Sequence, residues 1–221
     1  MRMLRALVFL AAAAAAGAAP AATVKLDFEG IGNLAFVNDF YNGGTDSQGH
    51  SGVDYGVSVS PTTMGLIDED AGGFGLLGHE PSPSTVLFFQ NSFNIILNVP
   101  AGFDTGFSFF YSTTDPASVR VFDRVDATGN LLGALDLAAI GFGSDCGDPG
   151  GFLCIWTRVD VTFSGTAKSI VIDGRPGSLI VDDITFSADT PVVSVPEPST
   201  YAMMALGLAG LAAWSRRRRR P

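Results

Sequence analysis

The stretch Phe107-Ser108-Phe109-Phe110-Tyr111 places large apolar side chains at every second position. Successive side chains of a β-strand point to opposite faces, so this spacing predicts a strand with Phe107, Phe109 and Tyr111 on its buried face. The same period recurs at residues 24–29, 53–59, 119–121, 159–163, 170–172 and 180–186. The apolar runs 86–89 and 94–99 are typical of strands buried on both faces, although a short helical segment fits such runs too.

Turn-forming residues separate these runs. Gly, Asn, Asp and Pro cluster between them, the chain contains 27 glycines, and no amphipathic helix of useful length is apparent in this part of the sequence. Short strands divided by turns predict an all-β fold, an antiparallel β-sandwich or jelly roll of roughly nine or ten strands. We place this domain at residues 23–190.

The predicted domain is strongly acidic. Residues 23–195 hold six basic and 21 acidic side chains, a net charge of −15, whereas the whole chain has a formal charge of −9. Such a surface repels nucleic acid, so we expect no nucleic-acid partner. It attracts divalent cations, but it also fits a surface that only keeps an exported protein soluble.

Residues 1–22 have the organisation of a secretory signal peptide. Arg2 and Arg5 form a positively charged start, an apolar run covers residues 7–16, and Ala19-Pro20-Ala21 is a cleavage site with small residues. We expect signal peptidase to release a mature chain that begins just after this site. The alternative is a retained N-terminal membrane helix, for which the apolar run is short.

A Pro-Glu-Pro turn, an apolar segment and an arginine cluster follow the domain. Pro196 and Pro198 lack a backbone N–H, so a helix begins only after them, over about residues 200–215. Its apolar part spans roughly 21 Å, less than the roughly 30 Å of a bilayer core. Interfacial aromatic side chains and terminal arginines nevertheless favour a single membrane anchor over a C-terminal core helix. These anchoring residues are Tyr201, Trp214, Arg216, Arg217, Arg218, Arg219 and Arg220.

Pro196, Glu197 and Pro198, followed by a short apolar helix and an arginine cluster, resemble the PEP-CTERM sorting signal of Gram-negative bacteria. The resemblance covers residues 191–221. It implies that these three residues are the recognition element and that the helix holds the exported protein in the inner membrane for a time. It also implies processing near the motif by an exosortase, an integral-membrane cysteine transpeptidase, and a final location at the cell surface or outside the cell.

The body of the chain also resembles exported PEP-CTERM proteins that share four short motifs. The motifs lie here at residues 27–30, 41–44, 52–57 and 106–109. For those proteins the resemblance implies export and no defined activity. We therefore expect a structural or adhesive protein of the cell surface or of the extracellular matrix, with extracellular polysaccharide as its partner.

Carboxylates near both ends of the domain predict a calcium site. Sandwiches often place the first and last strands side by side, and Ca²⁺ prefers six to eight oxygen ligands. The segment Asp-Phe-Glu at the start of the domain and the segment Asp-Asp-Ile at its end resemble segments of calcium-bearing jelly rolls of the carbohydrate-module type. That resemblance implies Glu29 and Asp183 as ligands, with Asp27, Asp46 and the Gly43 carbonyl as second choices. The alternative is that these residues only fill turns. The second functional hypothesis is a Ca²⁺-dependent carbohydrate-binding module.

Two further features fit an exported protein. Cys146 and Cys154 lie in a loop rich in Gly, Asp and Pro, and in an oxidising compartment we expect them to form a disulfide rather than two free thiols. Trp156 is the candidate for stacking on a sugar ring, together with Tyr111 and Phe110, because these aromatics break or flank the alternation.

The sequence offers little for catalysis. His50 and His79 each lie in a Gly-rich loop, and the motifs of serine hydrolases, zinc proteases and phosphate-binding loops are absent. Asp68-Glu69-Asp70 are adjacent on a turn, whereas glycoside hydrolysis needs two carboxyl groups across a cleft. We therefore expect no enzymatic activity, and a glycan hydrolase is the third hypothesis.

Overall fold

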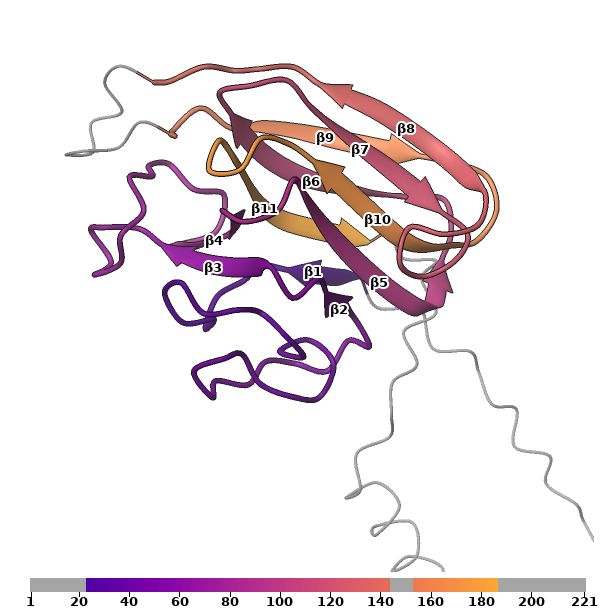
Figure 1. Ribbon diagram of the computed structural model, residues 1–221, viewed down its shortest axis with the longest axis horizontal. Helices are drawn as coiled ribbons and strands as arrows, with labels where there is room; N and C mark the ends of the chain where they lie inside the picture. The colour runs from indigo at the N-terminus through magenta and orange to yellow at the C-terminus, as the bar shows by residue number, and fades with distance from the viewer. Residues whose placement is uncertain (1–22, 144–152, 187–221) are drawn as a thin grey trace, which may run out of the picture.

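The computed structural model describes residues 23–143 and 153–186, and these form two antiparallel sheets packed face to face (Figure 1). The first sheet contains β1 (Val24–Leu26), β3 (Thr63–Ile67), β4 (Thr85–Phe89), β6 (Gly106–Thr113), β9 (Thr157–Thr162) and β11 (Leu179–Phe186). The second contains β2 (Ser58–Val59), β5 (Asn94–Phe103), β7 (Ala117–Phe122), β8 (Leu131–Leu137) and β10 (Ala167–Asp173). These ranges contain no helix, and the predicted all-β sandwich is confirmed.

The last strand lies in the middle of the first sheet. The strand order is β3-β4-β11-β6-β9, and β1 pairs with β11 beside its C-terminal half, so that Val24 lies opposite Phe186. The first and last strands are therefore neighbours, as the sequence predicted. The second sheet has the order β2-β5-β10-β7-β8. All pairings between these named strands are antiparallel, and because the two sheets pack face to face, each strand presents one face to the space between them.

Aromatic side chains fill the space between the two sheets. In β6 the predicted alternation is confirmed, because Phe107, Phe109 and Tyr111 are buried while Ser108 and Phe110 point outward. Phe103 at the end of β5 bridges the layers, with its ring centroid 5.9 Å from that of Phe107 and 5.0 Å from that of Phe186. Edge-to-face packing of this kind stabilises the core beyond the area that it buries.

A smaller apolar cluster lies on the outer face of the first sheet. It joins Met64 and Leu66 of β3, Val86 and Phe88 of β4, Ile180 of β11, and Leu77 from the connection between β3 and β4. Leu153 and Trp156 pack against this cluster from the segment that leads into β9. The outer face is therefore covered at β3 and β4, while the outward side chains of β6 and β9 remain more exposed.

Three details differ from the sequence prediction. The described residues form eleven strands, more than the roughly nine or ten predicted. The strand predicted over residues 53–59 is reduced to β2, because the backbone N–H groups of Tyr55 and Val57 bond to the carbonyl of Tyr41 instead of to a sheet. The run 94–99 is not buried on both faces, because the outward side chains of this half of β5 are only partly covered.

Candidate functional site

An acidic seam forms where β1 meets β11. We use this name for Asp27, Asp182 and Asp183 together with Lys25 and Ser82. The β11 strand has a bulge at this point, and Asp183 adopts a left-handed backbone conformation with φ of 54°. The bulge turns both neighbouring carboxylates to the outer side of the strand, where Lys25 Nζ lies 2.9 Å from Asp183 Oδ1.

Asp182 is the most deeply buried member of the seam. Its Oδ2 accepts a hydrogen bond of 2.9 Å from the backbone N–H of Ser82, and its Oδ1 accepts one of 2.7 Å from the N–H of Asp183. Ser82 Oγ lies 2.9 Å from both Asp182 Oδ1 and the carbonyl oxygen of Asp27. These contacts tie the connection between β3 and β4 to the start and the end of the domain.

Burial changes the protonation of the seam. Desolvation raises the pKa of Asp182 from its ordinary 3.8 to about 7, and the charge of Asp183 adds to this effect. The hydrogen bond and the charge of Asp183 raise the pKa of Lys25, so the ammonium stays charged. Burial also raises the pKa of Tyr41, whose hydroxyl oxygen accepts a hydrogen bond of 2.8 Å from the N–H of Phe28.

Glu29 fixes the start of β4. Its Oε1 accepts hydrogen bonds of 3.0 and 2.8 Å from the backbone N–H groups of Ser84 and Thr85. Its Oε2 accepts bonds from the hydroxyl groups of the same two residues. Neither of these two donor residues was singled out from the sequence. Their four hydrogen bonds give Glu29 a structural role, which is to hold the start of β4.

Asp46 closes the loop that precedes β2. Its Oδ1 accepts hydrogen bonds from the N–H groups of Gln48 and His50, and its Oδ2 accepts one of 2.8 Å from Gly32. His50 Nδ1 also lies 2.8 Å from Oδ2. Burial alone would raise the pKa of Asp46, but these hydrogen bonds outweigh it and lower the pKa to about 2.

The five predicted calcium ligands do not converge on one point. Glu29 and Asp46 each bind a different loop, and Gly43 lies beside the side chain of Asp54. Asp27 and Asp183 are brought near the same side chain, because Asp183 forms an ion pair with Lys25 and the charge of Asp27 also raises the pKa of that lysine. No group of three or more His, Cys, Asp or Glu side chains within residues 23–143 and 153–186 could hold a metal ion. The calcium site stays a prediction.

The candidate stacking residues have separate environments. Trp156 is partly buried against the outer apolar cluster, and its indole N–H donates a hydrogen bond of 3.0 Å to the carbonyl of Gly78. Tyr111 is buried in the core, with its hydroxyl bonded to the carbonyl of Ala138. Phe110 is half-buried on the outer face, opposite Arg158 of β9. A ligand-stacking role for Trp156 stays a prediction.

Several predicted features lie outside the described residues. They are the signal peptide, Cys146, the Pro-Glu-Pro motif, the anchoring aromatics and the five arginines. Cys154 is described and buried, but the disulfide stays a prediction because its expected partner is not described. Within the two described ranges, no helix is long and apolar enough to cross a membrane.

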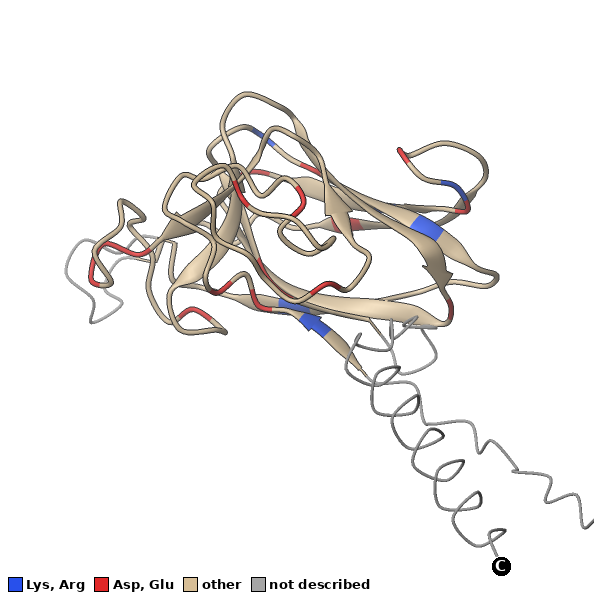
Figure 2. Cartoon of the chain, turned by 90° about the horizontal axis from the view of Figure 1, so that it is seen from below, with Lys and Arg blue, Asp and Glu red and all other residues tan. Residues whose placement is uncertain are grey.

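Few positive charges remain unpaired on the surface, where acidic side chains outnumber basic ones (Figure 2). Four of the six basic residues of the domain form ion pairs, namely Lys25 with Asp183, Arg120 with Asp173, Arg158 with Asp160, and Arg175 with Asp115. Exposed ion pairs contribute little to stability, but they neutralise these cations. The remaining surface field is negative and disfavours anionic ligands.

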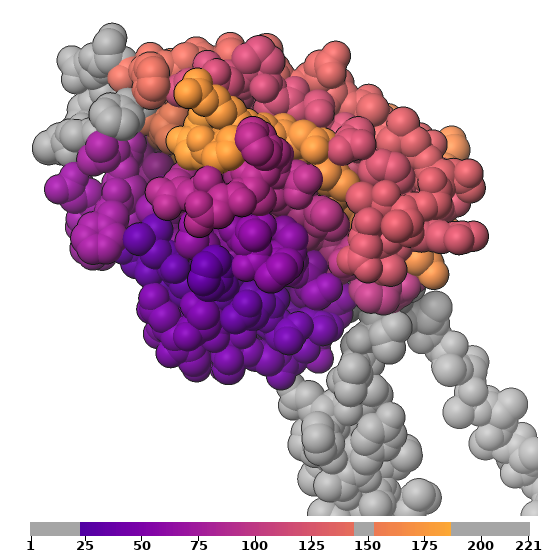
Figure 3. Space-filling model, in the orientation of Figure 1, coloured from indigo at the N-terminus to yellow at the C-terminus, as the bar shows by residue number. Residues whose placement is uncertain are grey.

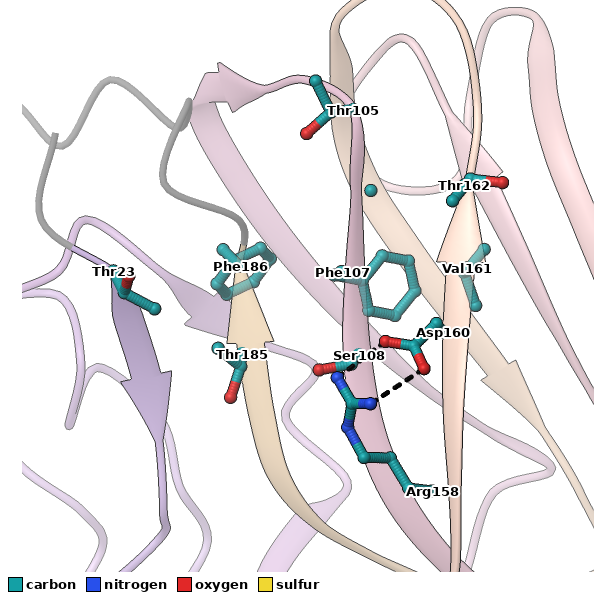
Figure 4. Close-up of a pocket in the computed structure, with 11 residues that line it drawn as sticks. Thr23, Thr105, Phe107, Ser108, Arg158, Asp160, Val161, Thr162, Thr185 and Phe186 are labelled. Atoms are coloured by element: carbon teal, nitrogen blue, oxygen red, sulfur yellow. Dashed lines mark hydrogen bonds and ion pairs between the residues drawn. The ribbon is translucent and has the colours of Figure 1, made fainter.

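A hollow of about 440 Å³ lies on the outer face of β11, β6 and β9 (Figure 4). Thr185, Ser108 and Asp160 form a row across its floor, because they are opposite one another in the strand register. Arg158 Nη2 lies 2.7 Å from Asp160 Oδ1 at one side. Thr23 and Phe186, the first and last residues that the structure describes, also line this hollow. We call this side of the sandwich the tail end.

A family model of the PEP-CTERM protein-sorting motif matches residues 194–219. The chain carries a PEP-CTERM protein-sorting motif. The match contains Pro196, Glu197 and Pro198, the predicted recognition element, and it supports an exported protein that is a substrate of an exosortase. The sorting resemblance seen in the sequence is thereby confirmed. Because the match covers only this segment, it gives no information on the ligand of the folded body.

Comparison with solved structures finds β-sandwich modules of low similarity, and no curated protein matches the sequence. A family 6 carbohydrate-binding module is 19% identical, with 59% of this chain and 86% of the module covered and a TM-score of 0.35. A carbohydrate-binding module of Cellvibrio mixtus lichenase 5A is 12% identical, with 56% and 85% covered and a TM-score of 0.31. The adhesin domain K3 of Lys-gingipain from Porphyromonas gingivalis is 15% identical, with 76% and 92% covered and a TM-score of 0.30. Similarity this low carries no argument about function.

The buried carboxylate of Asp182 makes the stability of the domain depend on pH. Because its pKa is about 7 in the folded chain and 3.8 ordinarily, the folded state binds the extra proton between these values. Its contribution to the free energy of unfolding is therefore complete below about pH 4 and falls by roughly 4 kcal/mol as the pH rises to about 7. Asp182→Asn removes this titration, so the stability difference between wild type and variant should decline over the same range. Urea unfolding at several pH values measures it.

The control for this measurement is Asp160→Asn, which removes an exposed carboxylate on the outer face of β9. We expect its stability to follow the wild-type pH profile. Parallel profiles of wild type and Asp182→Asn from pH 4 to 8 would contradict the assignment of the raised pKa to Asp182.

Asp46 affects the pH dependence of stability in the opposite direction to Asp182. Its folded pKa of about 2 lies below the ordinary 3.8, so its contribution to stability is present above about pH 4 and is lost as the pH falls through 2. We expect Asp46→Ala to lower the free energy of unfolding at pH 6 by about 2–4 kcal/mol, because three backbone N–H groups lose their acceptor. Thermal unfolding at pH 6 and pH 2 measures this, and the difference from wild type should shrink at pH 2. His50→Ala leaves those three bonds intact and should have little effect, whereas an equal loss in both variants would argue against the backbone bonds as the cause.

Proposed function

We propose that an exosortase processes this exported protein and that its folded body then acts, without catalysis, at the cell surface or in the extracellular matrix. The observation that carries this proposal is the position of the sorting motif. The motif begins at residue 194, eight residues after β11 ends at Phe186. Eight extended residues reach at most about 29 Å, so the tail end of the sandwich stays close to any membrane or surface to which the motif delivers it.

The contacts of the acidic turn support a role without catalysis. Asp68 is buried and accepts hydrogen bonds from the backbone N–H groups of Glu69 and Leu77. Glu69 and Asp70 are exposed on the same turn. These three carboxyl groups thus do not face one another across a cleft, which is the arrangement that glycoside hydrolysis requires.

The processing step is tested by the intact mass of the protein in its native host. We expect the form in the medium to begin near Ala22 and to end near Pro196, so that it lacks the five arginines, because the exosortase removes the segment after the motif. Glu197→Ala should abolish this form and leave the longer chain in the membrane fraction. Mass spectrometry of both fractions measures the two forms.

Lys168→Ala serves as the control, because it changes a partly exposed side chain of β10 and leaves the motif intact. Its fragment masses should shift only by the mass of the substitution. A chain that keeps its arginines in every fraction would contradict processing and would favour a permanently anchored protein.

A second candidate function is Ca²⁺-dependent carbohydrate binding, and the acidic seam is the observation that favours it. Asp183 forms an ion pair with Lys25, the charge of Asp27 also acts on this lysine, and the side chain of Lys25 is 48% exposed. A divalent cation that displaced this ammonium would contact the Asp183 carboxylate and would also be attracted by the charge of Asp27. The same cation would favour the ionised form of Asp182 and so oppose its raised pKa.

Calcium binding at the seam should stabilise the fold. At a Ca²⁺ concentration one hundred times the dissociation constant, the gain is about 2.7 kcal/mol, or roughly 5–10 °C in melting temperature for a domain of this size. We expect this rise for the wild type with Ca²⁺, a smaller rise with Mg²⁺, and none for Asp183→Asn. Differential scanning fluorimetry after chelator treatment measures it. An unchanged melting temperature up to millimolar Ca²⁺ would remove this candidate, and an equal rise in Asp183→Asn would move the site elsewhere.

A further inference from the structure

An apolar groove lies away from the tail end. We name it the distal groove. It has a volume of about 220 Å³, its walls include Leu66, Leu77, Phe88 and Leu153, and the exposed residues Phe74 and Gln90 also line it. In Figure 3 the segment 68–84 (purple) that supplies Phe74 and Leu77 forms a projecting part of the surface on the left.

The strand order puts the distal groove at the opposite end of β11 from the tail. Gly177, which lines the groove, precedes the start of β11, and Gln90 directly follows β4, whose end lies near that start. The tail leaves after Phe186, at the other end of the same strand. At about 3.3 Å per residue, the eight residues of β11 separate the two ends by roughly 26 Å. A body tethered through residues 187–194 therefore presents the distal groove away from its anchor.

Phe74 is held in place although its side chain is 75% exposed. Its backbone N–H and that of Gly75 both bond to the carbonyl of Ile67, and the N–H of Gly73 bonds to the carbonyl of Asp68. A side chain at Gly73 would collide with the backbone of Ile67, so only glycine fits this tight turn. The backbone that carries the aromatic ring is thus fixed by folding, so a ligand that stacks on the ring loses little affinity to ordering the loop.

The chemistry of the groove fits a sugar ring. An exposed aromatic face beside apolar walls receives the C–H face of a pyranose, while the amide of Gln90 can donate and accept hydrogen bonds with hydroxyl groups. The volume of about 220 Å³ is smaller than the pockets that enclose whole small molecules, so the groove suits one ring of a longer polymer.

The negative charge of the surface favours uncharged polymers over anionic ones. Glu69 and Asp70 are exposed on the turn that leads to Phe74, and the net charge of residues 23–195 is −15. Anionic polysaccharides and anionic lipid head groups are repelled by such a surface. An uncharged polymer meets no such barrier.

We propose that the distal groove binds one ring of a neutral polysaccharide, with Phe74 as the stacking residue and Gln90 as the hydrogen-bonding residue. This inference rests on the proposed surface role, to which it adds the class of partner. It also assigns the stacking role to Phe74, whereas Trp156, the candidate from the sequence, supports the neighbouring wall through its bond to Gly78.

The test is affinity electrophoresis of the full-length protein, purified in a detergent without a sugar head group. The probes are three neutral polysaccharides, hydroxyethylcellulose, dextran and mannan, and one anionic polysaccharide, alginate. We expect at least one neutral polymer to retard the wild type and alginate to have no effect. Phe74→Ala should weaken the retardation about tenfold, and Gln90→Ala should weaken it severalfold.

Phe93→Ala is the matched control, because Phe93 is 72% exposed but does not line the groove. It should bind as the wild type does, and unchanged melting temperatures should confirm that all three variants fold. Retardation by none of the neutral polymers, retardation by alginate alone, or an equal loss in Phe93→Ala would overturn the proposal. So would capture of an apolar peptide at Phe74 in the absence of polysaccharide binding.

The assay uses purified protein, so its result does not depend on processing of the tail. Retardation that depends on Phe74, together with an unprocessed tail in the cell, would uphold the groove and remove the proposed delivery. A processed tail without retardation by any neutral polymer would uphold the proposed delivery and overturn the proposed binding at the distal groove.

Discussion

The central position of β11 is the constraint on which the rest of the molecule depends. This strand is the last of the domain, yet it pairs with β1, β4 and β6. The first sheet therefore lacks its central strand, β11, until the chain has been synthesised as far as Phe186. Pairing of residues so distant in sequence is slow, because the loop must close before the contacts form. For an exported chain, this order means that the sheet is completed only after almost all of the body has been translocated.

The same constraint determines where the two ends of the body lie. Because β1 is antiparallel to β11, the chain enters the sandwich beside the point where it leaves, at Val24 and Phe186. The loops that follow β4 and β6 then gather at the other end. One end of the sandwich is thus committed to the connection with the sorting motif, and the opposite end is available for contact with other molecules.

The layered fold could be predicted from sequence because its signal is local. The alternation of apolar residues in 107–111 predicts which side chains of β6 face the core, and turn-forming residues indicate where the strands end. Residues 53–57 show the limit of this signal. Their side chains alternate as those of a strand do. The carbonyl oxygen of Tyr41, however, accepts the hydrogen bonds of the Tyr55 and Val57 N–H groups, so this segment does not join a sheet. Alternation indicates which side chains are buried, and the available partner decides whether a ladder forms.

The arrangement of the carboxylates could not be predicted, because it depends on which backbone donors the fold brings near. In sequence, Asp182 and Asp183 are equivalent, and both are buried in the fold, but at the bulge Asp182 binds Ser82 whereas Asp183 pairs with Lys25. Glu29 and Asp46 lie in Gly-rich surroundings that also suit cation ligands, yet each accepts hydrogen bonds from at least two backbone N–H groups, those of Ser84 and Thr85 for Glu29 and those of Gly32, Gln48 and His50 for Asp46. A β-sandwich with many irregular connections leaves many N–H groups without a ladder partner, and each needs an acceptor when it is buried. Acidic side chains supply those acceptors, which explains how a protein of such negative charge can still use its carboxylates to hold its loops together.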